Sequence, residues 1–232
     1  MKGVILAGGR GTRMLPLTAQ CNKHLLPVAG KPMIYWSIKK LVEAGIDELA
    51  IVTNAYEINH FEQALKPYQQ EMSISFFKQH EPTGIASALS LTESFTEQRK
   101  MVVLLGDNLF ADSLAGPVAR FVNEQTSARI FLTETNHPSR YAVAFFNREG
   151  ELRQIIEKPQ ITGEAKCVTG IYMYDASVYE MLRQIAPSER GEYELTDVNQ
   201  LFLKAGLLSY ECLEAGGMMP ERLRIIGGCN GC

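Results

Sequence analysis

Residues 2–13 read KGVILAGGRGTR, a short apolar run that passes directly into a loop containing three glycines. A continuous apolar run that stops at glycines is typical of a buried β-strand. Glycines in such a loop let backbone N–H groups approach the oxygens of an anion such as a phosphate. The stretch therefore predicts a strand followed by an anion-binding turn, although a plain glycine turn would have the same appearance.

Strands and helices are expected to alternate after this first strand. The strands are expected at residues 48–53, 73–77 and 101–105, and the helices from Pro32 to a stop at Gly45, at 57–65 and at 84–95. Residues 101–105 are apolar at every position, as in the middle of a parallel sheet. Alternation of this kind predicts βαβ units and an α/β, Rossmann-like fold with a doubly wound, mostly parallel mixed sheet.

After about residue 130 the pattern becomes richer in strands. Strand-like segments cover residues 129–133, 141–147, 152–157 and 167–174, and helices are expected at 176–185 and about 196–205. Thr196 is a suitable N-cap for the last of these helices. The second half is therefore expected to add a mixed β region that binds a substrate.

Length and composition narrow the class of protein. The chain has 232 residues, of which 46% are hydrophobic and 21% charged, so it resembles an ordinary globular domain rather than a disordered or collagen-like chain. No apolar run approaches the roughly 20 residues of a membrane-spanning helix, and the first apolar run is too short for a signal peptide. Five cysteines, an odd number, favour a reducing compartment, so we expect a cytoplasmic protein.

Charge is distributed unevenly along the chain. The net charge of −3 predicts no general affinity for nucleic acid or for a membrane surface. Yet no acidic residue precedes Glu43, whereas seven Lys or Arg residues do, which suggests a site for a small polyanion. A solvated basic helix face explains Lys39 and Lys40, but it suits Arg10, Arg13 and Lys23 less, because these lie in a Gly- and Pro-containing loop.

Several familiar motifs are excluded. A Walker A loop needs Ser or Thr after Gly-Lys, but Lys31 is followed by Pro32. The dinucleotide-binding fingerprint needs a third glycine where Met14 stands and an acidic residue some 20 positions later, so a dehydrogenase is not expected. Cys229 and Cys232 have Cys-x-x-Cys spacing but no second ligand pair, and no catalytic nucleophile motif is evident.

Three linked motifs resemble the sugar nucleotidyltransferases, and most closely a short form of the glucose-1-phosphate thymidylyltransferases. They are GGRGTR at residues 8–13, NKHLLPV at 22–28 and KPMIY at 31–35. Further matching segments are QHEPTGIA at 79–86, LGDN at 105–108, EKP at 157–159, VTGIY at 168–172 and GEYELTD at 191–197. The resemblance covers about residues 1–215.

The resemblance implies a reaction between dTTP and a sugar 1-phosphate, expected to be glucose 1-phosphate, that gives a dTDP-sugar and pyrophosphate. A sugar-phosphate oxygen would attack the α-phosphorus in line, with Mg²⁺ as cofactor. UTP, CTP or another sugar phosphate remain alternatives. The resemblance also implies a homo-oligomer, and one domain over residues 1–232 with a nucleotide-binding half (about 1–130) and a sugar-binding half (about 131–215).

Site residues follow from the matched positions. The catalytic residues implied are Arg13, Lys23 and Asp107, with Asp107 also the metal ligand. The nucleotide-binding residues implied are Leu6, Ala7, Gly8, Gly9, Gly11, Thr12, Arg13, Gln79, Gly84 and Asp107, with Gln79 and Gly84 facing the base. The sugar-phosphate-binding residues implied are Ala142, Glu157, Lys158, Val168, Gly170 and Tyr172. The alternative for Asp107 is a structural role as a cap on the turn after its strand.

The sequence departs from the family pattern at two places. Ala142 stands where relatives usually have glycine near the sugar, so its methyl group either narrows the pocket or is without effect. Residues 216–232 form an atypical tail: no Asp follows Asp197, and the only Trp is Trp36. A Trp-x-Asp-x-Gly segment, whose aspartate is the second metal ligand in the family, is therefore missing. A nucleotide-sugar-binding homologue with impaired catalysis is thus the alternative to an active enzyme.

Overall fold

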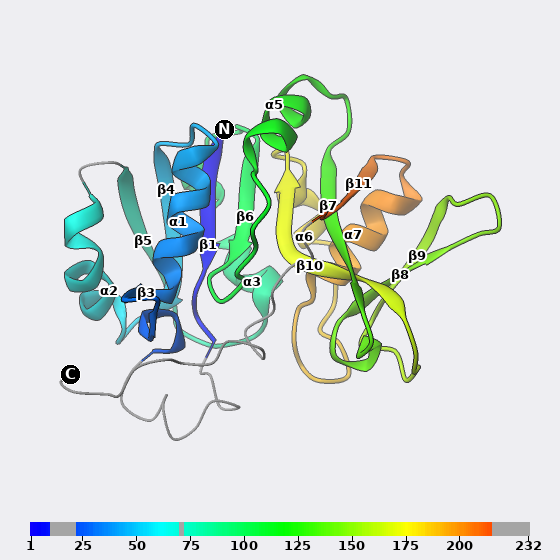
Figure 1. The fold of residues 1–232 in the computed structure, drawn as a ribbon, viewed down its shortest axis with the longest axis horizontal. Helices are drawn as coiled ribbons and strands as arrows, with labels where there is room; N and C mark the ends of the chain where they lie inside the picture. Colours follow the sequence, from blue (N-terminus) through cyan, green and yellow to red (C-terminus); the bar gives the residue numbers. More distant parts are fainter. Residues whose placement is uncertain (10–21, 70–71, 215–232) are drawn as a thin grey trace.

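A computed structural model describes residues 1–9, 22–69 and 72–214. One sheet runs through this part of the chain, with the strand order β11-β7-β10-β6-β1-β4-β5 (Figure 1). These strands are β1 (Lys2–Leu6), β4 (Glu48–Asn54), β5 (Ser73–Gln79), β6 (Met101–Leu105), β7 (Ala128–Thr135), β10 (Ala165–Tyr174) and β11 (Leu208–Cys212). The neighbours from β6 to β5 are parallel, and so are β11 and β7, whereas β10 runs antiparallel to both β6 and β7. The expected doubly wound, mostly parallel mixed sheet is confirmed.

A hairpin extends from the sheet beside β10. It consists of β8 (Ala142–Phe146) and β9 (Leu152–Glu157), and in Figure 1 it projects away from the parallel strands. β8 pairs antiparallel with both β9 and β10, through Val143 and Cys167 in the latter case. The hairpin therefore joins the sheet through β10.

Helices cover both faces of the sheet because successive side chains of a strand point to opposite sides. Ile5 packs with α1 (Met33–Glu43), α2 (Ile58–Leu65) and α5 (Ala115–Asn123). Val4 and Leu6 pack with α3 (Ile85–Ser90), α6 (Val178–Leu182) and α7 (Leu195–Lys204). The shorter elements are η2 (Lys23–Leu25), β2 (Pro27–Val28), β3 (Lys31–Pro32), η3 (Lys66–Tyr68), α4 (Glu93–Thr96) and η4 (Pro138–Arg140).

Two expectations about helices are wrong. The single helix expected at 84–95 is divided into α3 and α4, because Thr92 donates its hydroxyl to the carbonyl of Leu89 at 2.8 Å and contacts the Tyr179 hydroxyl at 3.0 Å. Thr196 is not an N-cap: Glu194 precedes α7, and Thr196 lies inside its first turn with its hydroxyl on Glu157. α5 and β11 were not expected from the sequence.

The helices in the described residues are all short. The longest of them, α1, has 11 residues, about half the length that a membrane-spanning helix needs. None of the helices between residues 1 and 214 that the structure describes could therefore cross a bilayer.

Candidate functional site

The carboxyl end of β1, a central strand, lies at the edge of the sheet that the carboxyl ends of the parallel strands form, and hydrogen bonds hold it there. The amide of Ala7 donates to Val52 at 2.8 Å, and its carbonyl accepts from Thr53 Oγ1 at 3.1 Å. Leu6 accepts a hydrogen bond at 3.0 Å from the amide of Gly106, which follows β6. Ligands of doubly wound sheets bind outside the carboxyl ends of the strands, so this edge is the first place to look for a site.

An ion pair stands at this edge beside the glycine loop. Lys23, at the start of η2, bonds through Nζ to Oδ2 of Asp107, which follows β6. A Cβ placed on Gly9 would lie 3.2 Å from Lys23 Nζ, so the ammonium group lies against the loop. Burial is the largest single influence and raises the pKa of Asp107, but the charge of Lys23, its hydrogen bond and smaller nearby contributions together outweigh burial, so the pKa is lowered. An ammonium group and an ionised carboxylate therefore adjoin the described part of the predicted anion-binding turn.

His24 is buried next to Lys23 in the chain and was not singled out from the sequence. Its ring is buried, and burial followed by the charge of Lys23 lowers its pKa to about 3, so the ring is neutral. Nδ1 lies 2.7 Å from Oδ1 of Asn22, which accepts only, so this nitrogen carries the proton. A Cβ on Gly106 would be 2.8 Å from the ring. In the sequence, His24 is marked only by its place between Lys23 and two leucines. Such a context is too common to indicate a functional residue by itself.

Gln79 reaches the same edge from the end of β5. Its Nε2 donates to the carbonyl of Gly84 at 3.2 Å and to Ser87 Oγ at 3.3 Å, and a Cβ on Gly8 would come within 2.5 Å of its Oε1. Gly84 has φ +116°, and a Cβ there would lie 2.5 Å from the carbonyl oxygen of Tyr193, so both φ and space require glycine. The structure thus brings Gln79 and Gly84 together next to Gly8.

A second group of charged side chains lies at the base of the β8–β9 hairpin. Glu157 pairs in register with the half-buried Ala142. Lys158 has a positive φ of 44° and donates its amide to Tyr141 at 3.0 Å, and its Nζ lies 3.4 Å from Glu157 Oε1. Thr196 donates to the other carboxylate oxygen of Glu157 at 2.5 Å. The expected neighbours Ala142, Glu157 and Lys158 are therefore together.

Arg190 belongs to this group and was missed in the sequence. Its Nη2 lies 3.4 Å from Glu157 Oε1, the same oxygen that Lys158 faces, and 2.5 Å from Glu194. Burial raises the pKa of Glu194 despite the hydrogen bond from Arg190, and burial together with the charge of Glu157 raises the pKa of Asp197. The residue precedes the matched segment GEYELTD, and only the tertiary structure reveals its contact with Glu157.

β10 connects the part of the sheet beside the Lys23–Asp107 ion pair with the charged group at the base of the hairpin. Gly170 passes so close to the end of β6 that a Cβ would be 2.9 Å from the Leu105 side chain. Val168 and Tyr172 are buried in the same strand. Burial raises the pKa of the Tyr172 hydroxyl, and the negative charge of Glu157 raises it further, which keeps this hydroxyl protonated. The strand that carries Val168, Gly170 and Tyr172 therefore runs beside β6, which ends at Leu105, two residues before Asp107.

Three predicted residues, Gly11, Thr12 and Arg13, lie outside the described residues, as does the tail at 216–232. Within the described ranges no three His, Cys, Asp or Glu side chains come together as metal ligands. As a metal ligand, Asp107 would supply a single carboxylate. It fits Mg²⁺ bound through one or two carboxylates together with substrate phosphates, but not a cage made by protein alone.

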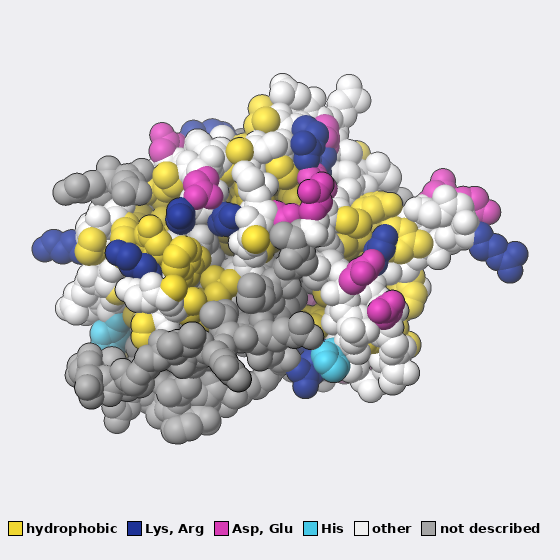
Figure 2. Space-filling model, in the orientation of Figure 1, with side chains coloured by type: hydrophobic (Ala, Val, Ile, Leu, Met, Phe, Trp, Pro, Cys, Tyr) yellow, Lys and Arg dark blue, Asp and Glu magenta, His cyan; other side chains and the backbone are white. Residues whose placement is uncertain are grey.

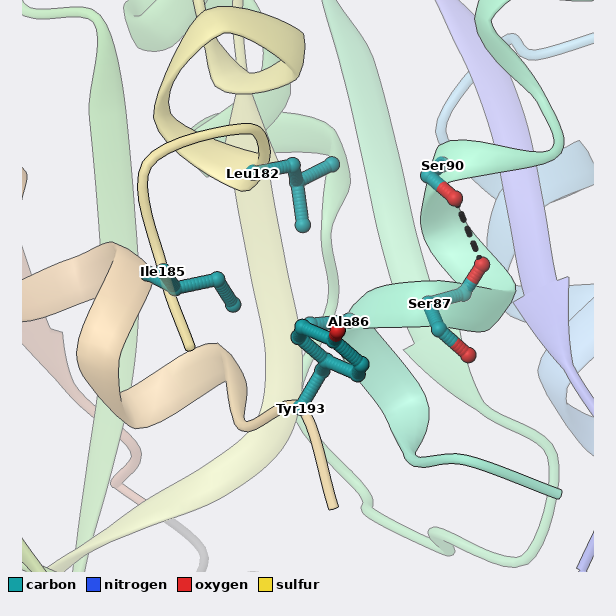
Figure 3. A pocket seen from close by; sticks show the side chains of 6 residues that line it. All are labelled: Ala86, Ser87, Ser90, Leu182, Ile185 and Tyr193. Atoms are coloured by element: carbon teal, nitrogen blue, oxygen red, sulfur yellow. Dashed lines mark hydrogen bonds between the residues drawn. The ribbon is translucent and has the colours of Figure 1, made fainter. Parts of the chain in front are cut away.

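A cavity of about 140 Å³ lies between α3 and α6 (Figure 3). It is lined by Ala86, Ser87, Ser90, Leu182, Ile185 and Tyr193. None of these side chains is charged, so the cavity is unsuited to a phosphate. On the face drawn in Figure 2, the Lys and Arg side chains of the described residues are scattered among acidic ones and do not form a basic patch.

Comparison with known proteins matches the chain over nearly its whole length. The sequence profile described as nucleotidyl transferase covers residues 2–217. The chain is 37% identical over 219 residues to a glucose-1-phosphate thymidylyltransferase of Actinoplanes sp., a match that covers 94% of this chain and 72% of the relative. The enzyme of the same name from Neisseria meningitidis serogroup A is 37% identical over 93% of this chain and 76% of its own length.

Solved structures agree with this result. A Bacillus anthracis protein, provisionally assigned as a glucose-1-phosphate thymidylyltransferase and solved with sucrose, has a TM-score of 0.88 at 38% identity and covers 95% of this chain and 89% of its own. A UDP-glucose pyrophosphorylase solved with UDP-glucose has a TM-score of 0.79 at 24% identity over 94% and 91% of the two chains, which shows a shared fold. The chain belongs to the nucleotidyl transferase family and resembles its glucose-1-phosphate thymidylyltransferases.

Proposed function

We propose that this protein transfers the nucleotidyl group of dTTP to glucose 1-phosphate, giving dTDP-glucose and pyrophosphate. The observation that carries the proposal is the Lys23–Asp107 pair beside Gly9, at the carboxyl ends of β1 and β6. The names of the Actinoplanes and Neisseria relatives support the choice of substrates.

The proposed roles at the nucleotide begin with the glycine loop. The amides of Gly8 and Gly9 would bind the triphosphate, with Gly11, Thr12 and Arg13 continuing the loop. Lys23 would neutralise charge that grows on the α-phosphate as an oxygen of the sugar phosphate attacks and pyrophosphate leaves on the opposite side. Such a displacement needs position and charge more than covalent help from the protein, and fixed cations supply both.

The charged group at the base of the β8–β9 hairpin is proposed to bind the sugar phosphate. Lys158 would bind the phosphate, with Arg190 beside it, while Glu157 would accept hydrogen bonds from sugar hydroxyls. Ala142, Val168, Gly170 and Tyr172 would shape the pocket. The half of the chain from about residue 131 to 215 would then bind the sugar, and the half before it would bind the nucleotide.

Asp107 is the residue that would hold Mg²⁺ together with the substrate phosphates. When bound, the ion would offset negative charge on those phosphates. Lys23 already holds the Asp107 carboxylate ionised, which is the form that a divalent cation requires. We also propose a cytoplasmic homo-oligomer, and the free thiols of Cys167 and Cys212 fit a reducing compartment.

A second function, nucleotide-sugar binding without turnover, is favoured by one observation. The sequence has no Asp after Asp197, so a second carboxylate for the metal is missing from the segment where the family has one. With one carboxylate the charge on the phosphates would be less fully neutralised, and catalysis would suffer before binding does.

Pyrophosphate release distinguishes the two functions. The protein is mixed with glucose 1-phosphate, Mg²⁺ and either dTTP, UTP or CTP, and pyrophosphate is measured with a coupled enzyme. Turnover that is fastest with dTTP and is lost in Asp107→Asn supports the proposed enzyme. Thermal stabilisation by dTDP-glucose without pyrophosphate release would instead support the binding protein, and the absence of both would contradict both functions.

A further inference from the structure

A serine lies behind Gln79, with its hydroxyl oxygen 3.3 Å from the amide nitrogen Nε2. We propose that Ser87 is a positioning residue: it holds Gln79 with Oε1 toward the nucleotide loop, so that the site prefers pyrimidines with an N3–H, thymine and uracil, over cytosine. The inference rests on the proposed function, because it takes Gln79 to face the base of a bound nucleotide.

The hydroxyl of Ser87 is the centre of a small network. It lies 3.2 Å from the carbonyl of Gly84, 2.7 Å from Thr83 Oγ1 and 3.3 Å from Gln79 Nε2. A hydroxyl offers one donor and two acceptor positions. Donation to the Gly84 carbonyl leaves both acceptor positions for Thr83 and Gln79, so every hydrogen-bonding position of Ser87 is used.

The same network decides which end of the Gln79 amide points inward. The Gly84 carbonyl can only accept, so the amide atom 3.2 Å from it must be the NH₂ group. Its second hydrogen goes to Ser87. Rotating the amide by 180° would put two carbonyl oxygens face to face and would leave the NH₂ group without these two acceptors in a side chain that is 7% exposed.

Oε1 therefore faces the opposite way, toward Gly8. The missing Cβ of that glycine leaves the space that Oε1 occupies, because a methyl group there would be only 2.5 Å from the oxygen. An acceptor is thus presented at the end of β1, where the nucleotide is proposed to lie. The direction is fixed before any ligand arrives, so no rotation is needed on binding.

A fixed acceptor discriminates among pyrimidines. Thymine and uracil carry a hydrogen on N3 and can donate to Oε1, whereas cytosine has a lone pair at N3 and would repel it. Sites built to hydrogen-bond one group reject an analogue lacking it by factors of roughly 10⁴–10⁵. The network does not separate thymine from uracil, because their N3–H groups are the same.

Ser90 provides a matched control on the same helix. It lines the cavity between α3 and α6 together with Ser87 (Figure 3), but its hydroxyl donates to the main-chain oxygen of Ser87 at 2.7 Å. Removing it leaves the Ser87 hydroxyl in place. Ser87→Ala removes that hydroxyl, Ser87→Thr keeps one, and Thr83→Val removes one of its partners.

The test measures equilibrium binding of dTTP, dUTP and dCTP by calorimetry, which needs no turnover. We expect the wild type to bind dTTP and dUTP at least about 100-fold more tightly than dCTP. Ser87→Ala should reduce this ratio by about 3- to 10-fold, as expected for one hydrogen bond, and Thr83→Val should change it in the same direction. Ser87→Thr should restore the ratio and Ser90→Ala should leave it unchanged, with melting temperatures confirming that each variant is folded.

Two results would overturn the inference in different ways. A dTTP-to-dCTP ratio that is the same in Ser87→Ala and in the wild type, with dTTP still bound, would remove the positioning role alone and leave the proposed function intact. A wild type that binds none of the three nucleotides would overturn the inference together with the proposed function.

Discussion

Gly8 lies so close to Gln79 that the two positions are coupled. A Cβ on Gly8 would be 2.5 Å from Gln79 Oε1, a distance that real side chains do not show, so one of the two must move. We predict that Gly8→Ala weakens dTTP binding by about fivefold or more, since overpacking of this kind typically costs about 1–3 kcal/mol. Calorimetric titration measures the change.

Gly116→Ala is the control for this substitution. Gly116 lies in α5, where an added methyl would meet the flexible end of Arg120 at 3.3 Å and where alanine favours the helix. We expect this variant to bind dTTP as the wild type does. Equal affinities of the two variants would show that the Gly8–Gln79 contact is unimportant for the nucleotide.

Lys23 is predicted to act on the reaction rather than on the fold. Replacing a preorganised charge in an active site typically lowers the rate by roughly 10²–10³, and we expect Lys23→Gln to show a loss of this size in kcat. The side chain is 18% exposed and pairs with Asp107, so we expect the variant to remain folded. Lys39→Gln, on the solvent side of α1, should be neutral. Rates within threefold of each other in both variants would remove Lys23 from the mechanism.

A residue of the candidate site could be predicted from the sequence only where the residues around it already form a recognisable local pattern. Lys23 and Asp107 stood out because one lies in a Gly- and Pro-rich loop and the other ends an apolar strand. His24 and Arg190 did not, because a buried neutral ring and an arginine on Glu157 depend on partners far away in the chain. Ser87 likewise has no local signature.

At the scale of the helices and strands, we predict that one buried hydrogen bond between β10 and α7 contributes to the stability of the fold. Tyr174 donates its hydroxyl to Asn199 Oδ1 of α7 at 2.7 Å, and both residues are buried. Tyr174→Phe leaves that oxygen without its donor, which we expect to lower the free energy of unfolding by about 1–3 kcal/mol. Tyr210→Phe, at a residue that is 40% exposed, should change it by less than about 0.5 kcal/mol. Urea denaturation measures both, and equal values would contradict a role for the hydrogen bond.

A helix or strand could be predicted from the sequence where burial alone determines its pattern of apolar residues. β6 was expected at residues 101–105 and is found there, because a strand covered on both faces is apolar throughout. α5 was missed although Leu114, Val118 and Phe121 have helical spacing and are buried. The division between α3 and α4 depends on the contact of Thr92 with Tyr179, which no local pattern contains.

At the scale of the whole molecule, Lys2 ties the first strand to distant parts of the chain. Its side chain is 3% exposed and contacts Glu48 at 3.1 Å, Glu97 at 3.0 Å and the carbonyl of Phe95 at 2.6 Å. Hydrogen bonds from Lys2 and Arg99 and the charge of Lys2 lower the pKa of both glutamates from 4.5. A pKa that is lower in the folded state stabilises the fold above the unfolded value, and this contribution is lost as pH falls through the folded value.

Stability should therefore decline between about pH 5 and pH 3, and part of the decline should depend on Lys2. We predict a flatter dependence of the melting temperature on pH in Lys2→Met than in the wild type, even if the variant is less stable overall. Lys31→Met, at an exposed lysine, should keep the wild-type dependence. Parallel curves for the wild type and Lys2→Met would contradict the assignment.

The arrangement of the whole site was predictable only in part. The rule that strand ends carry the ligand placed Asp107 near the glycine loop, and 84 positions separate it from its partner Lys23. The position of the charged group at the base of the β8–β9 hairpin could not be predicted from the sequence. It depends on β10 running antiparallel to β6 and on the close passage of Gly170 past Leu105. Side-chain patterns report burial, but they do not report which strand lies next to which.

The most direct measurement is a crystal structure of the complex with dTDP-glucose and Mg²⁺. The account predicts that the diphosphate lies against the amides of Gly8 and Gly9 and the Lys23 ammonium group, with the Asp107 carboxylate on the metal. A diphosphate bound away from the carboxyl ends of β1 and β6, or a metal that does not contact Asp107, would contradict it.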